Sequence, residues 1–200
     1  EAVVVADVPS DVTVVGIPAK IVRVHGQKDE PTIHEVEEQR EYYLDKLEHA
    51  RMVQLAAVGN TIPVALDGAF KFNQLGIPAV AGDIWETQAA YTFNLGHEDV
   101  VMVISNSGSS KRLQTLAEGA KENGCTVILI TNNGNSPLAR ICDYKIVTAT
   151  REKLLTEEFW FSRVTATAVM EILYLLLRAG MKGSMEHIRV MKKPYRRIRK

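Results

Sequence analysis

The chain has 200 residues, enough for one α/β domain of ordinary size with room for an added segment. Hydrophobic residues make up 46% and charged residues 24%, a balance typical of a protein with an apolar core and a solvated surface. The 24 basic and 24 acidic residues cancel, but residues 191–200 contain six Lys or Arg and no acid, so residues 1–190 carry 18 basic against 24 acidic residues. This distribution excludes a chain that is basic throughout, and nucleic acid could contact only the basic tail.

Cysteines and apolar stretches indicate the compartment. Cys125 and Cys142 belong to no C-x-x-C motif or Cys/His cluster, which is typical of reduced thiols in a cytoplasmic protein. No signal peptide is recognisable, and the apolar region 164–177 contains Glu171 and is too short to span a bilayer. We expect a cytoplasmic protein without a membrane span, without a metal site and without a cofactor. The sequence begins at Glu1 rather than Met, so a fragment of a longer chain is one interpretation.

The first 28 residues differ in kind from the rest. Residues 2–5 and 12–15 are short β runs, no amphipathic helix is present, and the segment is too short to hold its own core. A polar linker follows at residues 27–31.

From residue 33 onward, helical and strand patterns alternate. Apolar residues spaced by three and four predict helices over 33–49, 63–74, 84–93, 111–120, 136–139 and 157–179. Short apolar runs rich in β-branched residues predict strands at 53–58, 77–81, 100–104, 126–131 and 144–148. Strands this apolar are buried on both faces, so the sequence predicts a doubly wound parallel sheet of about five strands with helices on both faces.

A loop rich in hydroxyl groups follows the strand at 100–104. The sequence Ser105-Asn106-Ser107-Gly108-Ser109-Ser110 leads into a helix whose apolar stripe is Leu113, Leu116, Ala117 and Ala120. Free N–H groups and the positive end of the helix dipole make such a turn an anion site, to which the Ser and Asn side chains add donors. The alternative is that Ser109 or Ser110 only caps the helix. The loop's place at the carboxyl end of a central strand favours a ligand.

Two other strand ends are polar. Gly59-Asn60-Thr61 follows the first core strand, and residues 131–136 follow the fourth. Carboxyl ends of parallel strands meet at one edge of a sheet, so both turns are expected to line the same crevice, although turn chemistry alone explains them as well.

Together these motifs are similar to those of the sugar isomerase (SIS) domain family, over about residues 33–185. The residues that carry the resemblance are 58–61, 99–110, 124–131, 136–139 with Asp143, and Phe161-Ser162-Arg163, the last being most similar to the RpiR-type phosphosugar-sensing branch. The resemblance implies a five-stranded parallel sheet, a homodimer or tetramer, and a sugar phosphate as ligand.

The same resemblance assigns roles within the loops. It implies that Ser105, Asn106, Ser107 and Ser110 hold the phosphate, with Asn60 and Thr61 near the sugar; position 110 keeps a hydroxyl where many members have Thr. RpiR-type regulators bind DNA through a helix-turn-helix that precedes this domain. The sequence has no such module, so we do not expect nucleic-acid binding within this chain.

Catalysis is a separate question. Aldose–ketose isomerisation needs a base that moves a proton between neighbouring carbons and groups that open the sugar ring. Glu152 resembles the catalytic glutamate of the glucosamine-phosphate synthase branch, His187 could be a ring-opening acid, and Glu86 could line the pocket rim. The alternative for each of these residues is a solvated surface position without a catalytic role. His97 is likewise expected in an exposed turn. The sequence favours a sensing or regulatory phosphosugar-binding module, with an isomerase using Glu152 as base as the alternative.

Residues 1–28 resemble another family. The run from Ala2 to Pro9 and the run from Thr13 to Arg23, with its Gly-Ile-Pro-Ala-Lys element, resemble the closing coil of hexapeptide-repeat acyltransferases such as serine acetyltransferase. That family has a left-handed β-helix fold, but the preceding repeats and the catalytic His are missing, so acetyl transfer is not expected. We expect three parts: a β-helix-like remnant or docking segment at 1–28, the SIS domain at 29–190 and a basic tail at 191–200.

Overall fold

The computed structural model describes residues 12–15, 20–24, 42–148 and 162–198, with side chains for 42–148 and 162–191. Glu152, the β run at 2–5, the first part of the helix expected over 33–49 and residues 157–161 of the expected last helix lie outside the described residues.

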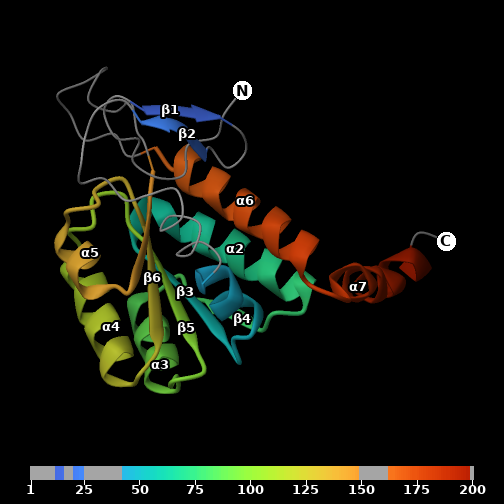
Figure 1. Ribbon diagram of the computed structural model, residues 1–200. Coiled ribbons are helices and arrows are strands. Elements are labelled where there is room, and N and C mark those ends of the chain that lie inside the picture. The colour runs from blue at the N-terminus through green and yellow to red at the C-terminus, as the bar shows by residue number, and fades with distance from the viewer. Residues whose placement is uncertain (1–11, 16–19, 25–41, 149–161, 199–200) are drawn as a thin grey trace.

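A five-stranded parallel sheet forms the centre of the molecule, as predicted (Figure 1). The spatial order is β4-β3-β5-β6-β7, and every neighbouring pair is parallel. The strands are β3 (Val53–Ala57), β4 (Ala79–Ala81), β5 (Val100–Ile104), β6 (Thr126–Thr131) and β7 (Tyr144–Val147). β4 is two residues shorter than the predicted run because it begins at Ala79, where it pairs with Val53, the first residue of β3.

The sheet is buried on both faces because each strand supplies apolar residues to two cores. Along β5, Met102 and Ile104 face a cluster shared with α2 (Ile62–Leu75) and α6 (Val164–Gly180). Val101 and Val103 face the opposite cluster, which includes α4 (Lys111–Glu122) and α5 (Pro137–Ile141). Figure 1 shows α2 and α6 on one side of the sheet and α3 (Trp85–Phe93), α4 and α5 on the other. The alternation of side chains along each strand therefore produces a three-layer fold.

Local sequence signals explain where most helices begin and end. The predicted stripe of α4 is buried, and Ser110 caps the helix by accepting a hydrogen bond from the Leu113 N–H. Ser136 caps α5 in the same way, with Pro137 in the first turn. Gly76 ends α2 with a φ of 91°, a left-handed conformation that glycine adopts without strain.

The last core helix begins later than the apolar pattern predicts. Ser162 and Arg163 are not helical, and α6 begins at Val164. The Ser162 hydroxyl accepts a hydrogen bond from the Val164 N–H (3.3 Å), and the Ser162 carbonyl accepts one from the Asn106 side chain (2.9 Å). The start of α6 is therefore fixed by a polar contact with a distant loop, which helical periodicity does not report.

A further helix, α7 (Ser184–Ile198), contains most of the predicted basic tail. It projects from the end of α6 (Figure 1). Among the described residues, no single helix is long and apolar enough to span a membrane; α6 and residues 184–191 reach that length and composition only as a pair bent by 111°. Near the N-terminus, β1 (Val12–Val15) pairs with β2 (Lys20–Val24) as an antiparallel two-stranded sheet. The acyltransferase-like nature of residues 1–28 stays a prediction.

Candidate functional site

The strand order places a topological switch point at the carboxyl ends of β3 and β5. The chain passes from β3 to β4 on one side and then returns to β5 on the other side of β3. Connections leave these two strands in opposite directions, which opens the sheet edge to a ligand. The Gly59–Thr61 turn and the Ser105–Ser110 loop both begin at this point.

Thr61 joins the two segments. Its hydroxyl lies 3.0 Å from the carbonyl oxygens of both Val58 and Ile104, and the residue is only 5% exposed. Since a hydroxyl has one hydrogen, it donates to one carbonyl at a time. Thr61 therefore holds the turn against the end of β5, and a contact between its side chain and the sugar stays a prediction.

The Ser105–Ser110 loop is folded on itself by its own hydroxyl groups. The Ser105 oxygen accepts a hydrogen bond from the Gly108 N–H (3.2 Å), and the Ser107 oxygen accepts one from the Ser109 N–H (3.3 Å). Ser105 is buried, Ser107 and Ser110 are half-buried, and Ser109 is exposed. The loop is thus preformed, with Ser107 and Ser110 still reachable from solvent.

Gly108 lets the loop approach α5 closely. Its φ is 64°, and a Cβ at this position would lie 2.0 Å from the Ser136 Oγ. The Gly108 carbonyl also accepts a hydrogen bond from the Leu138 N–H (3.1 Å). The loop therefore rests directly on the start of α5, and only glycine fits there.

Asn106 connects the loop to β6 and α6. Its carbonyl accepts hydrogen bonds from the Thr131 hydroxyl (2.9 Å) and the Asn132 N–H (3.0 Å). Its side-chain amide donates to the Ser162 carbonyl (2.9 Å). These bonds bring the polar end of β6 and the Ser162-Arg163 pair to the same edge as the loop.

Positive groups gather at this edge. Helices α2, α4 and α6 all begin there, and each presents the positive end of its dipole. Lys111, Arg112 and Arg163 are exposed in or next to the first turns of α4 and α6. Sequence reasoning missed these cations as site residues, although Lys111 and Arg112 directly follow the loop in the sequence. Arg163 is brought near the loop only by the contact between Ser162 and Asn106.

The other candidate site residues lie away from the Ser105–Ser110 loop or outside the described residues. His187 packs beside Gly76, where a Cβ would lie 3.3 Å from the imidazole Cγ, at the far end of α2. Within one chain it is therefore at the opposite edge of the sheet and cannot serve the loop as an acid. Glu86 is exposed in the first turn of α3, and Glu152 is not described. Within the described ranges, no group of three His, Cys, Asp or Glu could hold a metal ion.

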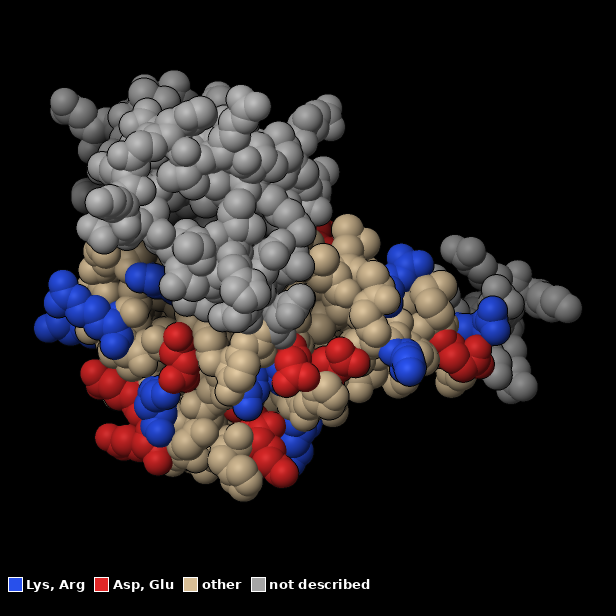
Figure 2. All heavy atoms as spheres, in the orientation of Figure 1, with Lys and Arg blue, Asp and Glu red and all other residues tan. Residues whose placement is uncertain are grey.

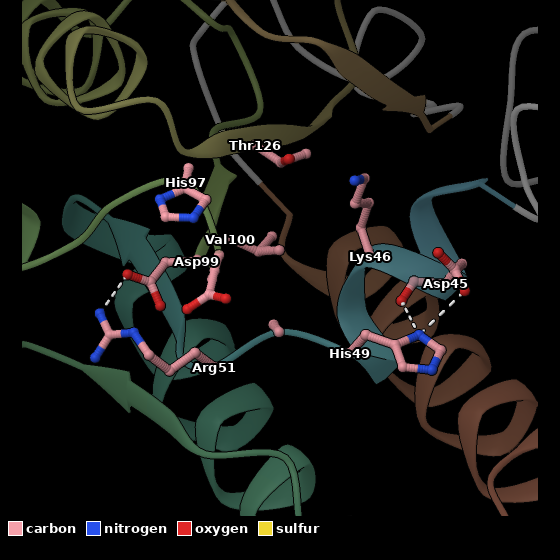
Figure 3. A pocket seen from close by; sticks show the side chains of 10 residues that line it. Asp45, Lys46, His49, Arg51, His97, Asp99, Val100 and Thr126 are labelled. Carbon is pink, nitrogen blue, oxygen red and sulfur yellow. Dashed lines mark hydrogen bonds and ion pairs between the residues drawn. The ribbon is translucent and has the colours of Figure 1, made fainter.

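A hollow of about 310 Å³ lies at the amino-terminal edge of the sheet (Figure 3). Val100 and Thr126, the first residues of β5 and β6, line it, together with the exposed His97. Arg51 pairs with the buried Asp99 carboxylate at 2.5 Å, and His49 lies 3.0 Å from Asp45. Only the Asp99 carboxylate is buried, since the His49 and Asp45 side chains are both mostly exposed, and all four residues lie on the side opposite the loop.

Neither thiol is a nucleophile. Burial, and then the nearby Asp143, raise the pKa of Cys142 to about 12. Burial, and then Asp99, raise the pKa of Cys125. Because the thiolate is the reactive form, both cysteines are unreactive near neutral pH.

The chain is related in sequence to a transcriptional regulator. The chain is 31% identical over 133 residues to an uncharacterised HTH-type transcriptional regulator of Caldanaerobacter subterraneus, a match that covers 66% of this chain and 47% of the regulator. The chain thus spans about half the length of this relative.

Solved structures share the fold. The Vibrio vulnificus NanR protein complexed with ManNAc-6P superposes with a TM-score of 0.73 at 20% identity, covering 81% of this chain and 61% of NanR. The sugar isomerase domain of an RpiR transcription factor from Sphaerobacter thermophilus superposes with a TM-score of 0.68 at 22% identity, covering 80% and 86% of the two chains. The model of the SIS domain family matches residues 46–176, more than half of the chain. The chain therefore belongs to the SIS domain family.

Proposed function

We propose that this chain is a phosphosugar-binding module with a sensing or regulatory role in the cytoplasm, and that the Ser105–Ser110 loop holds the phosphate. The observation that carries the proposal is the preformed, hydroxyl-rich loop at the carboxyl ends of β3 and β5, close to the N-termini of three helices. Backbone N–H groups and helix dipoles at such an edge favour a dianionic phosphate.

The relatives support a regulatory role. An HTH-type transcriptional regulator is related in sequence, and NanR, solved with ManNAc-6P, shares the fold. Among the described residues on the face in view in Figure 2, acidic and basic side chains are interspersed.

We assign the phosphate to Ser105, Asn106, Ser107 and Ser110, and the sugar to the neighbourhood of Asn60 and Thr61. Ser107 and Ser110 are the more accessible hydroxyls. Ser105 and Thr61 contribute mainly by shaping the loop and the turn, because their hydroxyl groups bond to the backbone.

The alternative is an aldose–ketose isomerase of the same ligand class, with Glu152 as base. The observation that favours it is the family itself, whose name comes from sugar isomerases. Both functions require phosphate-dependent binding, and only the isomerase predicts turnover.

A binding assay separates these possibilities. The chain is titrated with hexose, pentose and amino-sugar phosphates, the matching free sugars and inorganic phosphate, while melting temperature and the NMR spectrum of the sugar are followed. We expect stabilisation by one or more sugar phosphates and none by the free sugars. Conversion that is lost in Glu152→Gln would replace the sensing function with the isomerase.

A loop variant tests the site. Ser105→Ala/Ser107→Ala is expected to weaken sugar-phosphate binding at least tenfold, because it removes two hydroxyl groups that shape and line the loop. Ser109→Ala is the matched control, since Ser109 lies in the same loop but is exposed and outside the predicted contact set. Unchanged affinity in the double variant would refute the assignment.

We also propose that the chain self-associates through the α2–α6 face. Leu66 and Phe70 lie four residues apart on α2 and are 44% and 58% exposed, and Leu175 on the neighbouring α6 is 54% exposed. Exposed apolar side chains on two packed helices are typical of an interface. Light scattering should give a dimer or tetramer for this chain and a smaller species for Phe70→Asp; a wild-type monomer would contradict the proposal.

A further inference from the structure

On the side of β3 that faces β4, the last residue of β3 forms its hydrogen bonds with a side chain instead of a strand. β4 pairs with β3 only from Val53 to Leu55, so its ladder stops before Ala57. The amide of Gln88, from α3, continues the pairing. Its oxygen accepts a hydrogen bond from the Ala57 N–H (3.0 Å), and its nitrogen donates one to the Ala57 carbonyl (2.8 Å). A primary amide therefore replaces the missing residue of the neighbouring strand.

Gln88 is itself held rigidly. It is 1% exposed, and its backbone carbonyl accepts a hydrogen bond from the Gln54 side chain (2.7 Å). The Thr92 hydroxyl lies 2.9 Å from the Gln54 side-chain oxygen and 3.1 Å from the Gln88 carbonyl. The turn after β4 passes close by, because a Cβ on Gly82 would lie 3.0 Å from the Gln88 Cγ. The Gln88 side chain thus has little room for another rotamer.

This network holds the residue that comes shortly before the Gly59–Thr61 turn of the candidate site. Ala57 is followed by Val58 and then by the Gly59–Thr61 turn, whose Thr61 hydroxyl reaches the Ile104 carbonyl beside the Ser105–Ser110 loop. Gln88 fixes the turn from the β4 side and Thr61 fixes it from the β5 side. A shift at Ala57 would therefore move the turn relative to the loop.

We propose that Gln88 is a positioning residue, which sets the affinity for the sugar phosphate by holding the end of β3 and the turn that follows it. The inference rests on the proposed function of the loop. Supporting groups of this kind commonly change affinity tenfold or more when removed, although they do not touch the ligand.

A pair of substitutions separates positioning from simple stabilisation. In Gln88→Met both hydrogen bonds to Ala57 are lost. In Gln88→Glu the outcome depends on protonation: a neutral carboxyl group can accept from the Ala57 N–H and donate to its carbonyl, whereas a carboxylate has only acceptors and is repelled by that carbonyl. Because burial disfavours the charged form, the carboxyl group regains its proton on mild acidification.

We expect both variants to bind the sugar phosphate about tenfold more weakly than the wild type at mildly alkaline pH. At mildly acidic pH, Gln88→Glu should approach wild-type affinity while Gln88→Met stays weak. Each Kd is divided by the wild-type value at the same pH, which removes the titration of the phosphate itself. The measurement is isothermal titration calorimetry, at a temperature where circular dichroism shows every variant folded.

Leu177→Ala is the control for lost stability alone. Leu177 is 3% exposed in the core on the last turns of α6, away from the ligand edge, so its truncation should lower the melting temperature and leave affinity unchanged. If both Gln88 variants bind like the wild type at every pH, the inference is wrong. If the wild type binds no sugar phosphate, the proposed function fails instead. Should the Gln88 variants not fold, Gly82→Ala, which presses on the Gln88 side chain, must weaken binding; wild-type affinity in that variant would equally overturn the inference.

Discussion

The contact between Gly108 and Ser136 gives the sharpest stability prediction. In Gly108→Ala the new Cβ would lie 2.0 Å from the Ser136 Oγ and 2.4 Å from the Ser136 Cβ, far inside van der Waals contact. The backbone φ of 64° adds about 1–2 kcal/mol for a residue other than glycine. Ser136 is 1% exposed and caps α5, so displacing it costs about 1 kcal/mol more.

We therefore expect Gly108→Ala to lower the free energy of unfolding by about 3 kcal/mol. For a chain of this size each kcal/mol lowers the melting temperature by about 2–4 °C. Urea titration followed by circular dichroism measures the first quantity, and a thermal scan measures the second. Ligand affinity should fall as well, because the loop cannot keep its place on α5.

Two further variants isolate the cause. Gly119→Ala changes a glycine in the neighbouring α4, where a Cβ would meet nothing within 4 Å, and should stabilise the protein by about 0.5–1 kcal/mol. Gly108→Ala/Ser136→Gly removes the clashing side chain and keeps most of the cap, so it should recover part of the lost stability. A Gly108→Ala protein within about 0.5 kcal/mol of the wild type would refute the steric argument.

Two predictions concern the opposite edge of the sheet and the thiols. Asp99→Ala should cost about 2 kcal/mol in urea unfolding, because the buried carboxylate accepts from Arg51 (2.5 Å) and from the Gly96 N–H (2.7 Å); the exposed neighbour Glu98 is the control, and an equal loss in Glu98→Ala would contradict the argument. For Cys142, the raised pKa of about 12 means that the folded state keeps its proton where the unfolded thiol, with a pKa of 9.0, loses it. The unfolding free energy should therefore fall as the pH rises from 9.0 towards about 12, and Cys142→Ala should reduce this dependence in urea titrations at several pH values; an unchanged slope would exclude the thiol as its source.

The fold was predictable from sequence because its signals are local. A continuous apolar strand such as 126–131 can bury the side chains of both its faces only between two helical layers. Apolar runs and helical stripes together therefore specify a parallel sheet covered on both faces. Caps such as Ser110 and Ser136 are equally local, because each bonds to an N–H three residues further on. The Ser105–Ser110 loop was identified as a candidate site for the same reason.

What sequence reasoning missed depends on contacts between distant residues. The late start of α6 follows from the bond between Asn106 and the Ser162 carbonyl, 56 residues apart. The role of Gln88 follows from the register of β4, whose last residue, Ala81, pairs with Leu55 and so leaves Ala57 uncovered on that side. No helix is predicted from the sequence for the basic end of the chain, whereas its described residues continue α7 to Ile198. Polar residues scattered through a sequence do not reveal which distant backbone group they will satisfy.

The candidate site and the core are joined by the same few polar contacts. Gln88 supports the turn after β3, Thr61 ties that turn to β5, and Asn106 ties the following loop to β6 and α6. Each of these side chains donates a hydrogen bond to a backbone carbonyl, so we expect them to act mainly by preorganising the loop and the helix N-termini. A phosphate would then be held largely by backbone dipoles whose positions these side chains maintain. Substitutions here should change affinity and stability together, whereas a core truncation such as Leu177→Ala should change stability alone.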